Sequence, residues 1–229
     1  MARKPSQKKP GREAAKRASA RASRKAGRAP KRAAPERRQQ ILESAGAVFA
    51  KASYARVGTA DLARAAGVSE PALYRYFSGK RELYVETLKA MGARLLDIWR
   101  GVAAGSDDPL EAIRAIGLGY YDHLQSRAPV LRLFYEAISE IDDAEIRRTV
   151  RESFRAMVGF VEGLVREGRA RGRVHPEVDP RIAAWHFMAI GLSFDLVHML
   201  GLGAELDREK VESWGSLYLG SLASGPEEE

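Results

Sequence analysis

Residues 59–77 read TADLARAAGVSEPALYRYF, a stretch that encodes two short helices separated by a tight turn. Thr59 can cap the free amides of the first helix, and Asp61 complements the positive end of its dipole. Gly67 suits the left-handed residue that ends a helix, and Ser69 can cap the second one. Two short helices joined by a three-residue turn with a glycine form a helix-turn-helix, which the spacing predicts here.

An amphipathic helix is predicted before this motif, over about residues 36–52. Its apolar positions recur at three- and four-residue spacing and comprise Ile41, Leu42, Ala45, Val48, Phe49 and Ala52. The second helix of the motif is predicted over residues 70–76. Leu73 and Phe77 share one of its faces and are expected to pack inward.

The opposite face of that second helix has the side chains that suit a DNA major groove. Seven helical residues span about 10 Å and fit a groove about 12 Å wide. Arg75 can reach a guanine edge there, and tyrosine or lysine side chains nearby can reach phosphates. The predicted DNA-binding residues are Thr59, Ser69, Pro71, Ala72, Tyr74, Arg75, Tyr76 and Lys80. The alternative is a small helical subdomain with an incidental turn.

This region resembles the DNA-binding domain of TetR-family transcriptional regulators over about residues 36–84. The resemblance rests on ILESA at 41–45, on AGVS at 66–69, and on LYRYF at 73–77 followed by GK and EL. It implies a dimeric, all-α, ligand-responsive regulator, usually a repressor, with its helix-turn-helix at residues 59–76. Many relatives have a basic or small polar residue where this chain has Glu70, so no phosphate contact is assigned to Glu70.

The 229-residue chain has a net charge of +8, and that charge is unevenly distributed. Residues 1–34 have a balance of +12, residues 35–83 of +3 and residues 84–229 of −7. The first segment lacks the apolar side chains that a core needs, which predicts a disordered basic tail. The tail is either an arm that adds non-specific phosphate contacts or a solvated extension.

The remainder of the chain is predicted to be helical, which gives an all-α fold. Residues 35–83 would form the DNA-binding domain and residues 84–229 an effector-binding and dimerisation domain. The helices expected after the motif cover about residues 80–104, 108–126, 129–137, 142–171, 180–201 and 207–222.

The helix over residues 180–200 is apolar nearly all round, so several of its sides must be covered. One face can line the interior while another packs with the last helix against a second subunit. The predicted dimer-interface residues are Trp185, Gly191, Ser193, Val211, Trp214, Leu217 and Tyr218. The alternative is that both helices complete the core of one monomer.

A pocket between the bundle helices is predicted to bind an apolar or aromatic effector. The predicted lining residues are Trp99, Ile113, Gly117, Tyr120, Leu124, Phe134, Phe154, Met157, Val158 and Phe187. The hydroxyl of Tyr120 or the ring of His123 would supply the polar contact. Aromatic residues at helical spacing are also typical of an ordinary core.

Several function classes lack their sequence signatures. The chain has no cysteine, which excludes disulfides and thiolate sites and fits a reducing cytoplasm. Its four histidines are too far apart for a local metal motif, and no G-x-S-x-G elbow, P-loop or GxGxxG turn is present. Asp195 and His198 could pair as a base and its orienter, although a satisfied structural pair is the simpler interpretation. We expect no cofactor, no metal and no catalytic site.

The longest apolar run, 183–194, is shorter than the roughly 18 to 20 residues of a membrane span, so a soluble protein is expected. The preferred function is a repressor that a small molecule releases from a palindromic operator on double-stranded DNA. The alternatives are an architectural DNA-binding protein that uses the basic tail and a small helical enzyme that uses a tyrosine or histidine.

Overall fold

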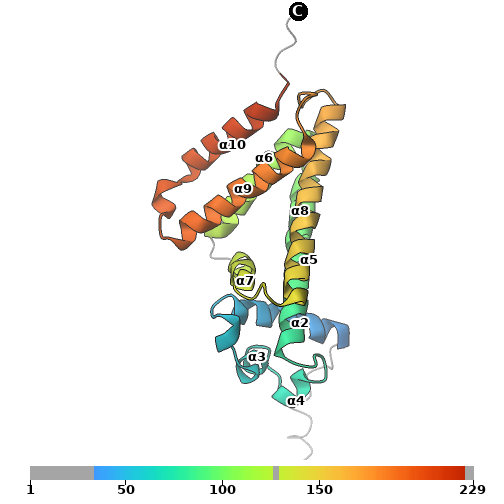
Figure 1. Cartoon of the computed structure of the whole chain (residues 1–229), viewed down its shortest axis with the longest axis vertical. Helices are drawn as coiled ribbons and strands as arrows, with labels where there is room; N and C mark the ends of the chain where they lie inside the picture. Colours follow the sequence, from blue (N-terminus) through green and yellow to red (C-terminus); the bar gives the residue numbers. More distant parts are fainter. Residues whose placement is uncertain (1–33, 126–128, 225–229) are drawn as a thin grey trace, which may run out of the picture. The chain divides into compact units, whose positions relative to one another are not determined.

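The computed structural model describes residues 34–125 and 129–224 (Figure 1). Its α-helices are α2 (Ala34–Phe49), α3 (Thr59–Ala65), α4 (Glu70–Leu73), α5 (Lys80–Ala103), α6 (Pro109–Gln125), α7 (Pro129–Ile138), α8 (Ala144–Ala170), α9 (Pro180–Met199) and α10 (Arg208–Leu222). Two short 3-10 helices, Tyr54–Arg56 and Gly203–Glu205, were not predicted. In the part of the chain described, β pairing is limited to one isolated bridge between Val174 and Ala223. The all-α prediction is confirmed.

The turn between α3 and α4 has the geometry that the sequence predicts. Gly67 has a φ of +62°, in the left-handed region that glycine adopts without strain. The amide of Val68 donates to the carbonyl of Ala63 at 2.9 Å, and the amide of Gly67 donates to that of Arg64 at 3.1 Å. These two bonds form a Schellman motif, which ends α3 and redirects the chain into α4.

Two local expectations about this motif were wrong. The N-cap of α3 is Gly58, whose amide donates to the Asp61 carboxylate at 3.4 Å, while Thr59 is already helical. Regular helix in α4 ends at Leu73 instead of Tyr76, and the chain continues as a turn. The Leu73 carbonyl accepts from the amide of Tyr76 at 2.9 Å as well as from that of Phe77 at 3.2 Å, so the segment tightens into a turn as Phe77 enters the core.

Two hydrophobic clusters form the core, and α5 contributes to both. One cluster joins α2, α3, α4 and the first half of α5 with residues of α7 and the start of α8. The other joins the second half of α5 with α6, α8, α9 and α10. Because α5, α7 and α8 all add side chains to the first cluster, the helix-turn-helix shares one hydrophobic core with part of the C-terminal helices.

Aspartate caps begin several of the C-terminal helices. The carboxylate of Asp179 accepts from the amides of Arg181 and Ile182 at 2.8 and 2.9 Å at the start of α9. The carboxylate of Asp207 accepts from the amide of Lys210 at 3.0 Å in the first turn of α10. These bonds satisfy amides that a helix leaves free, which fixes where each helix begins.

Helix α9 covers Pro180–Met199, close to the predicted range of 180–201, and it is long and apolar. In length and composition alone it would suit a membrane span, with a mean hydropathy of 1.3 over 18 residues, a third of which are buried. It includes the buried Asp195, which accepts a hydrogen bond from Tyr120 of α6. The solubility of the chain therefore stays a prediction.

Candidate DNA-binding surface and ligand cavity

The segment formed by α4 and the turn after it has one buried face and one exposed face. Leu73 and Phe77 are each 2% exposed and pack in the cluster of the helix-turn-helix, as predicted. Pro71 and Arg75 are exposed on the other face, and Tyr74 is 51% exposed. This face is therefore accessible to a DNA duplex.

Three predicted DNA-binding residues take part in contacts inside the motif. The hydroxyl of Thr59 donates to the Glu70 carboxylate at 2.6 Å, which links α3 to α4. The hydroxyl of Ser69 accepts from the amide of the half-buried Ala72 at 3.3 Å and caps α4, as predicted. A hydroxyl has one proton to donate, so Thr59 offers none to a phosphate while this bond lasts. Glu70 thus has a structural role in the angle between the two helices.

Lys80 and Tyr76 are more enclosed than the sequence indicated. The Lys80 ammonium donates to the backbone carbonyl oxygen of Tyr54 at 3.0 Å. It also lies 4.3 Å from the centroid of the Tyr54 ring. The Tyr54 ring in turn packs against Tyr84, at 4.8 Å between centroids. Tyr76 is half-buried against the same hydrophobic cluster. Lys80 retains two further protons that could reach a phosphate.

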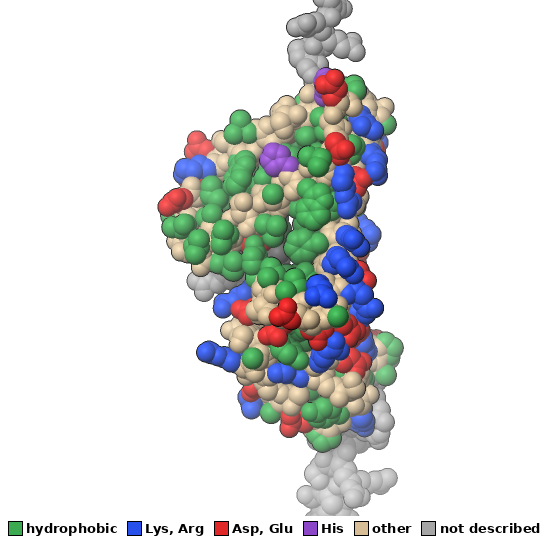
Figure 2. All heavy atoms as spheres, in the orientation of Figure 1, with side chains coloured by type: hydrophobic (Ala, Val, Ile, Leu, Met, Phe, Trp, Pro, Cys, Tyr) green, Lys and Arg blue, Asp and Glu red, His purple; other side chains and the backbone are tan. Residues whose placement is uncertain are grey.

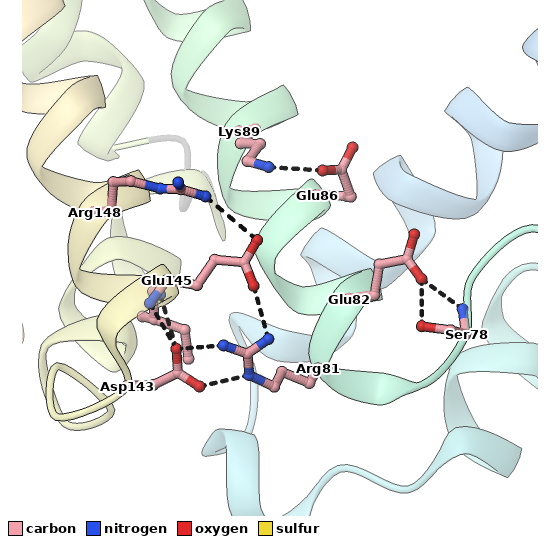
Figure 3. A network of polar contacts seen from close by, with 9 residues as sticks. Ser78, Arg81, Glu82, Glu86, Lys89, Asp143, Glu145 and Arg148 are labelled. Carbon is pink, nitrogen blue, oxygen red and sulfur yellow. Dashed lines mark hydrogen bonds and ion pairs between the residues drawn. The ribbon is translucent and has the colours of Figure 1, made fainter.

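An ion-pair network joins the start of α5 to the start of α8 (Figure 3). The Arg81 guanidinium donates to both carboxylate oxygens of Asp143, at 2.6 and 2.7 Å, and to Glu145 at 2.7 Å. These bonds to Arg81, with two from backbone amides, hold the pKa of Asp143 well below its usual range. A two-pronged pair of this kind fixes orientation as well as distance. The network ties the helix that follows the motif to the C-terminal bundle.

A hollow lined mainly by apolar and aromatic side chains lies among α5 to α9. It contains about 590 Å³ of empty space, including its opening to solvent. Its lining residues are Leu95, Trp99, Tyr120, Phe134, Tyr135, Ile138, Phe154, Met157, Phe187, Met188, Gly191, Leu192 and Asp195. The size and lining are typical of a site for a small organic molecule. We call this hollow the cavity.

Asp195 is the charged residue of the cavity and is 4% exposed. Its Oδ2 accepts from the Tyr120 hydroxyl at 2.7 Å, and its Oδ1 has no hydrogen-bond partner. Burial raises the pKa of this carboxyl to about 6, although hydrogen bonding from tyrosine hydroxyls opposes the shift. The hydrogen bond of this carboxylate comes from Tyr120, whereas His198 is exposed and acts on Asp195 only as a nearby charge that lowers its pKa.

The predicted effector residues divide between two places in the bundle. Six of them line the cavity: Trp99, Tyr120, Phe134, Phe154, Met157 and Phe187. Ile113 and Gly117 line a second hollow between α6 and α10, which Phe187 also borders. Val158 is fully buried in the core and lines neither hollow. The side chains of Leu124 and His123 lie outside the described part.

The predicted dimer-interface residues also divide, between exposed and buried positions. Trp185 is 43% exposed and Leu217 is 75% exposed, whereas Val211 and Tyr218 are buried within the core of the chain itself. Gly191 lines the cavity, and Trp214 and Ser193 are half-buried. Figure 2 shows hydrophobic side chains gathered over α9 and α10. The exposed apolar members on α9 and the loop after it are Ile182, Trp185, Leu196, Met199, Leu200 and Leu202.

Sequence reasoning missed several residues of the cavity. Asp195 was considered only with its neighbour in sequence, while its partner Tyr120 lies 75 residues away. Tyr135 donates to the carbonyl of Leu192 at 3.0 Å, another long-range contact. The available signal was Asp195 itself, a single acidic residue inside an apolar helix.

Comparison with known proteins decides the family of this fold. Residues 41–87 match the family described as bacterial regulatory proteins, tetR family. A crystal structure of a TetR-family transcriptional regulator from Agrobacterium tumefaciens superposes with a TM-score of 0.66 at 22% identity, covering 83% of this chain and 99% of the other. Residues 41–87 thus belong to the TetR family, and the chain as a whole has the fold of TetR-family regulators.

Curated relatives agree with this assignment of residues 41–87. HTH-type transcriptional regulator TtgR of Pseudomonas putida is 28% identical over 214 residues, which cover 86% of this chain and 96% of TtgR. HTH-type transcriptional activator FasR of Mycolicibacterium smegmatis is 34% identical over 101 residues, 44% of this chain. The match spans about half of FasR, 46% of its length. The relatives thus include an activator, so the family leaves the direction of regulation open.

Proposed function

We propose that this TetR-family regulator is a homodimeric repressor that binds a palindromic operator and is released by a small molecule in the cavity. In this proposal, residues 35–83 read DNA and residues 84–229 bind the effector and the second subunit. The exposed face with Pro71, Tyr74 and Arg75 would enter the major groove. The basic residues before position 34, which lie outside the described part, would add phosphate contacts in the cytoplasm.

The observation that carries the proposal is the position of α7 between the cavity and the helix-turn-helix. Phe134 lines the cavity and also belongs to the cluster that packs α3 and α4. Leu133 and Ala137, its neighbours on α7, are fully buried in that same cluster. A ligand that displaces Phe134 would therefore press on the packing that positions the DNA-binding helices. A ligand acts only through unequal binding to two states, and this shared side chain supplies the difference.

The exposed apolar face on α9 and α10 supports dimerisation. Large apolar side chains left in solvent mark a surface that another protein covers. A two-fold dimer places two recognition segments one DNA turn apart, about 34–36 Å, which a palindrome requires.

The alternatives considered from the sequence have less support. An enzyme would need a catalytic group, whereas Tyr120 is bonded to Asp195 and its pKa is raised well above normal, chiefly by burial.

A footprinting experiment on the DNA upstream of the protein's own gene tests the proposal. A repressor of this kind protects a palindrome, and an effector lowers its affinity for that site. By linkage, the operator then lowers effector affinity by the same factor. Uniform coating of any duplex would instead support the architectural alternative.

A further inference from the structure

The cavity contains a buried acid to which the described lining residues offer no basic partner. Among the described residues that line it there is no Lys, Arg or His. Asp195 is 4% exposed, and its Oδ1 has no hydrogen-bond partner. Buried carboxylates are normally paired, because an unpaired charge in an apolar environment is destabilising. The free carboxylate oxygen therefore lacks the partner that such a position normally has.

The other walls of the cavity suit a cation as well as an apolar group. Trp99 and Phe187 meet edge to face, with 5.8 Å between ring centroids, and Phe134 and Phe154 do so at 6.4 Å. The electron-rich faces of aromatic rings attract ammonium groups, and clusters of rings recognise quaternary ammonium ligands. An acid among aromatic rings thus combines the two features that recognise an organic cation.

We propose that the cavity binds a lipophilic organic cation whose ammonium group lies against Asp195 and whose apolar part lies among the aromatic side chains. The inference rests on the proposed function, since it assigns a ligand class to the effector site named there. Such a ligand would supply the missing partner of Oδ1 while Tyr120 keeps its bond to Oδ2. A neutral ligand of equal shape would leave the acid unpaired.

The test compares two compounds of nearly the same shape on the full chain. Benzyltrimethylammonium has a permanent positive charge, and neopentylbenzene replaces its nitrogen by carbon. Calorimetric titration at pH 8 is expected to show a preference for the cation of about tenfold or more. Asp195→Asn should abolish this preference without weakening the neutral compound. The control Asp97→Asn removes an exposed carboxylate that pairs with Arg100 on α5 and should leave the preference unchanged.

The pH dependence of the unmodified chain provides a test that needs no cavity variant. The pKa of Asp195 is raised to about 6, so the cation should bind less tightly at pH 5 than at pH 8. The titratable groups that influence this carboxyl are Tyr120 of α6, Tyr135 of α7 and His198 of α9. Both tyrosines have pKa values raised above 10, so they stay protonated throughout the range. His198→Gln should leave the pH effect in place.

Three results would overturn the inference. They are equal affinity for both compounds, a preference that survives in Asp195→Asn, and binding of neither compound. Operator binding measured on the same preparations separates this failure from that of the proposed function. A chain that binds its palindrome but not the cation contradicts the ligand class alone, whereas loss of operator binding contradicts the regulator proposal.

Discussion

Arg75 is the side chain on which base recognition depends in the proposed function. It is exposed on the face opposite the buried Leu73 and Phe77. If it contacts the O6 and N7 atoms of a guanine, Arg75→Ala should cost about 1–3 kcal/mol and relax the preference at one position of each half-site. Competition binding against single-base operator variants measures this. Equal losses on operator and random DNA would contradict the assignment.

Two nearby substitutions serve as controls for Arg75. Tyr76→Phe and Lys80→Ala are expected to weaken binding to all sequences alike, because their proposed partners are phosphates. Lys80→Ala also removes the bond to the Tyr54 carbonyl, so its stability must be measured alongside.

Asp195 makes the stability of the chain depend on pH. Its folded-state pKa of about 6 lies above the ordinary value of 3.8, so the folded chain holds a proton that the unfolded chain releases first. Stability should therefore fall as the pH rises from about 4 to about 6. Asp195→Asn should raise the free energy of unfolding by up to about 3 kcal/mol at pH 7.5 and change it little at pH 4. Urea unfolding at both values checks this, and an equal effect at both would contradict it.

Residue roles set by local chemistry could be predicted from the sequence, and those set by distant partners could not. Gly67 and Ser69 were placed correctly because a left-handed turn and a helix cap depend on adjacent amides. The bonds from Thr59 to Glu70 and from Tyr120 to Asp195 join residues 11 and 75 positions apart. Such pairs depend on how helices pack, which spacing does not encode.

At the scale of elements, the close packing of α5 on α8 depends on Gly92. A Cβ at this position would lie 2.6 Å from the Oγ and 3.1 Å from the Cβ of Ser153. Gly92→Ala should therefore destabilise the chain by about 1–3 kcal/mol, because the Ser153 side chain or its helix must shift. Gly101→Ala, on the same helix with no atom within 4 Å, should be neutral or stabilising. Thermal unfolding of both variants distinguishes packing from helix propensity.

The network around Arg81 is expected to transmit ligand binding between α8 and α5. Arg81→Ala removes the bonds to Asp143 and Glu145 shown in Figure 3. Binding at one site of a coupled protein commonly changes affinity at the other site about 5- to 150-fold. In Arg81→Ala, the factor by which the ligand changes operator affinity should fall towards one. Operator affinity with and without ligand measures it. Arg132→Ala removes a looser exposed pair with Glu136, at 3.9 Å, and should leave the factor unchanged.

The residues at which α9 and α10 begin were easier to predict from the sequence than the side of each helix that faces the core. Aspartates at positions 179 and 207 mark where α9 and α10 begin, because their carboxylates bond free amides. Both helices have apolar side chains on several sides, so periodicity could not separate the core face from the exposed face. Tyr218 is buried and Leu217 exposed, although either side chain could pack inward.

At the scale of the whole molecule, the basic N-terminal residues are expected to increase affinity for DNA of any sequence without changing the preference for the operator. Each phosphate neutralised on duplex DNA changes the slope of log affinity against log salt by about 0.9. Removing residues 2–33, which hold the whole +12 balance, should flatten this slope and weaken binding to operator and random DNA by similar factors. Titrations at several salt concentrations measure it. An unchanged slope would make these residues a solvated extension.

Phe187 forms a wall common to the cavity and to the second hollow between α6 and α10. Its ring lies close to the backbone at Gly117, where a Cβ would be 3.5 Å from Cε2. Shortening this one side chain would join the two hollows into a longer chamber. A single codon change would then alter the size of molecule that is sensed while every DNA-facing residue stays the same. In evolution, descendants of this gene can therefore acquire new chemical signals and keep their old target promoters.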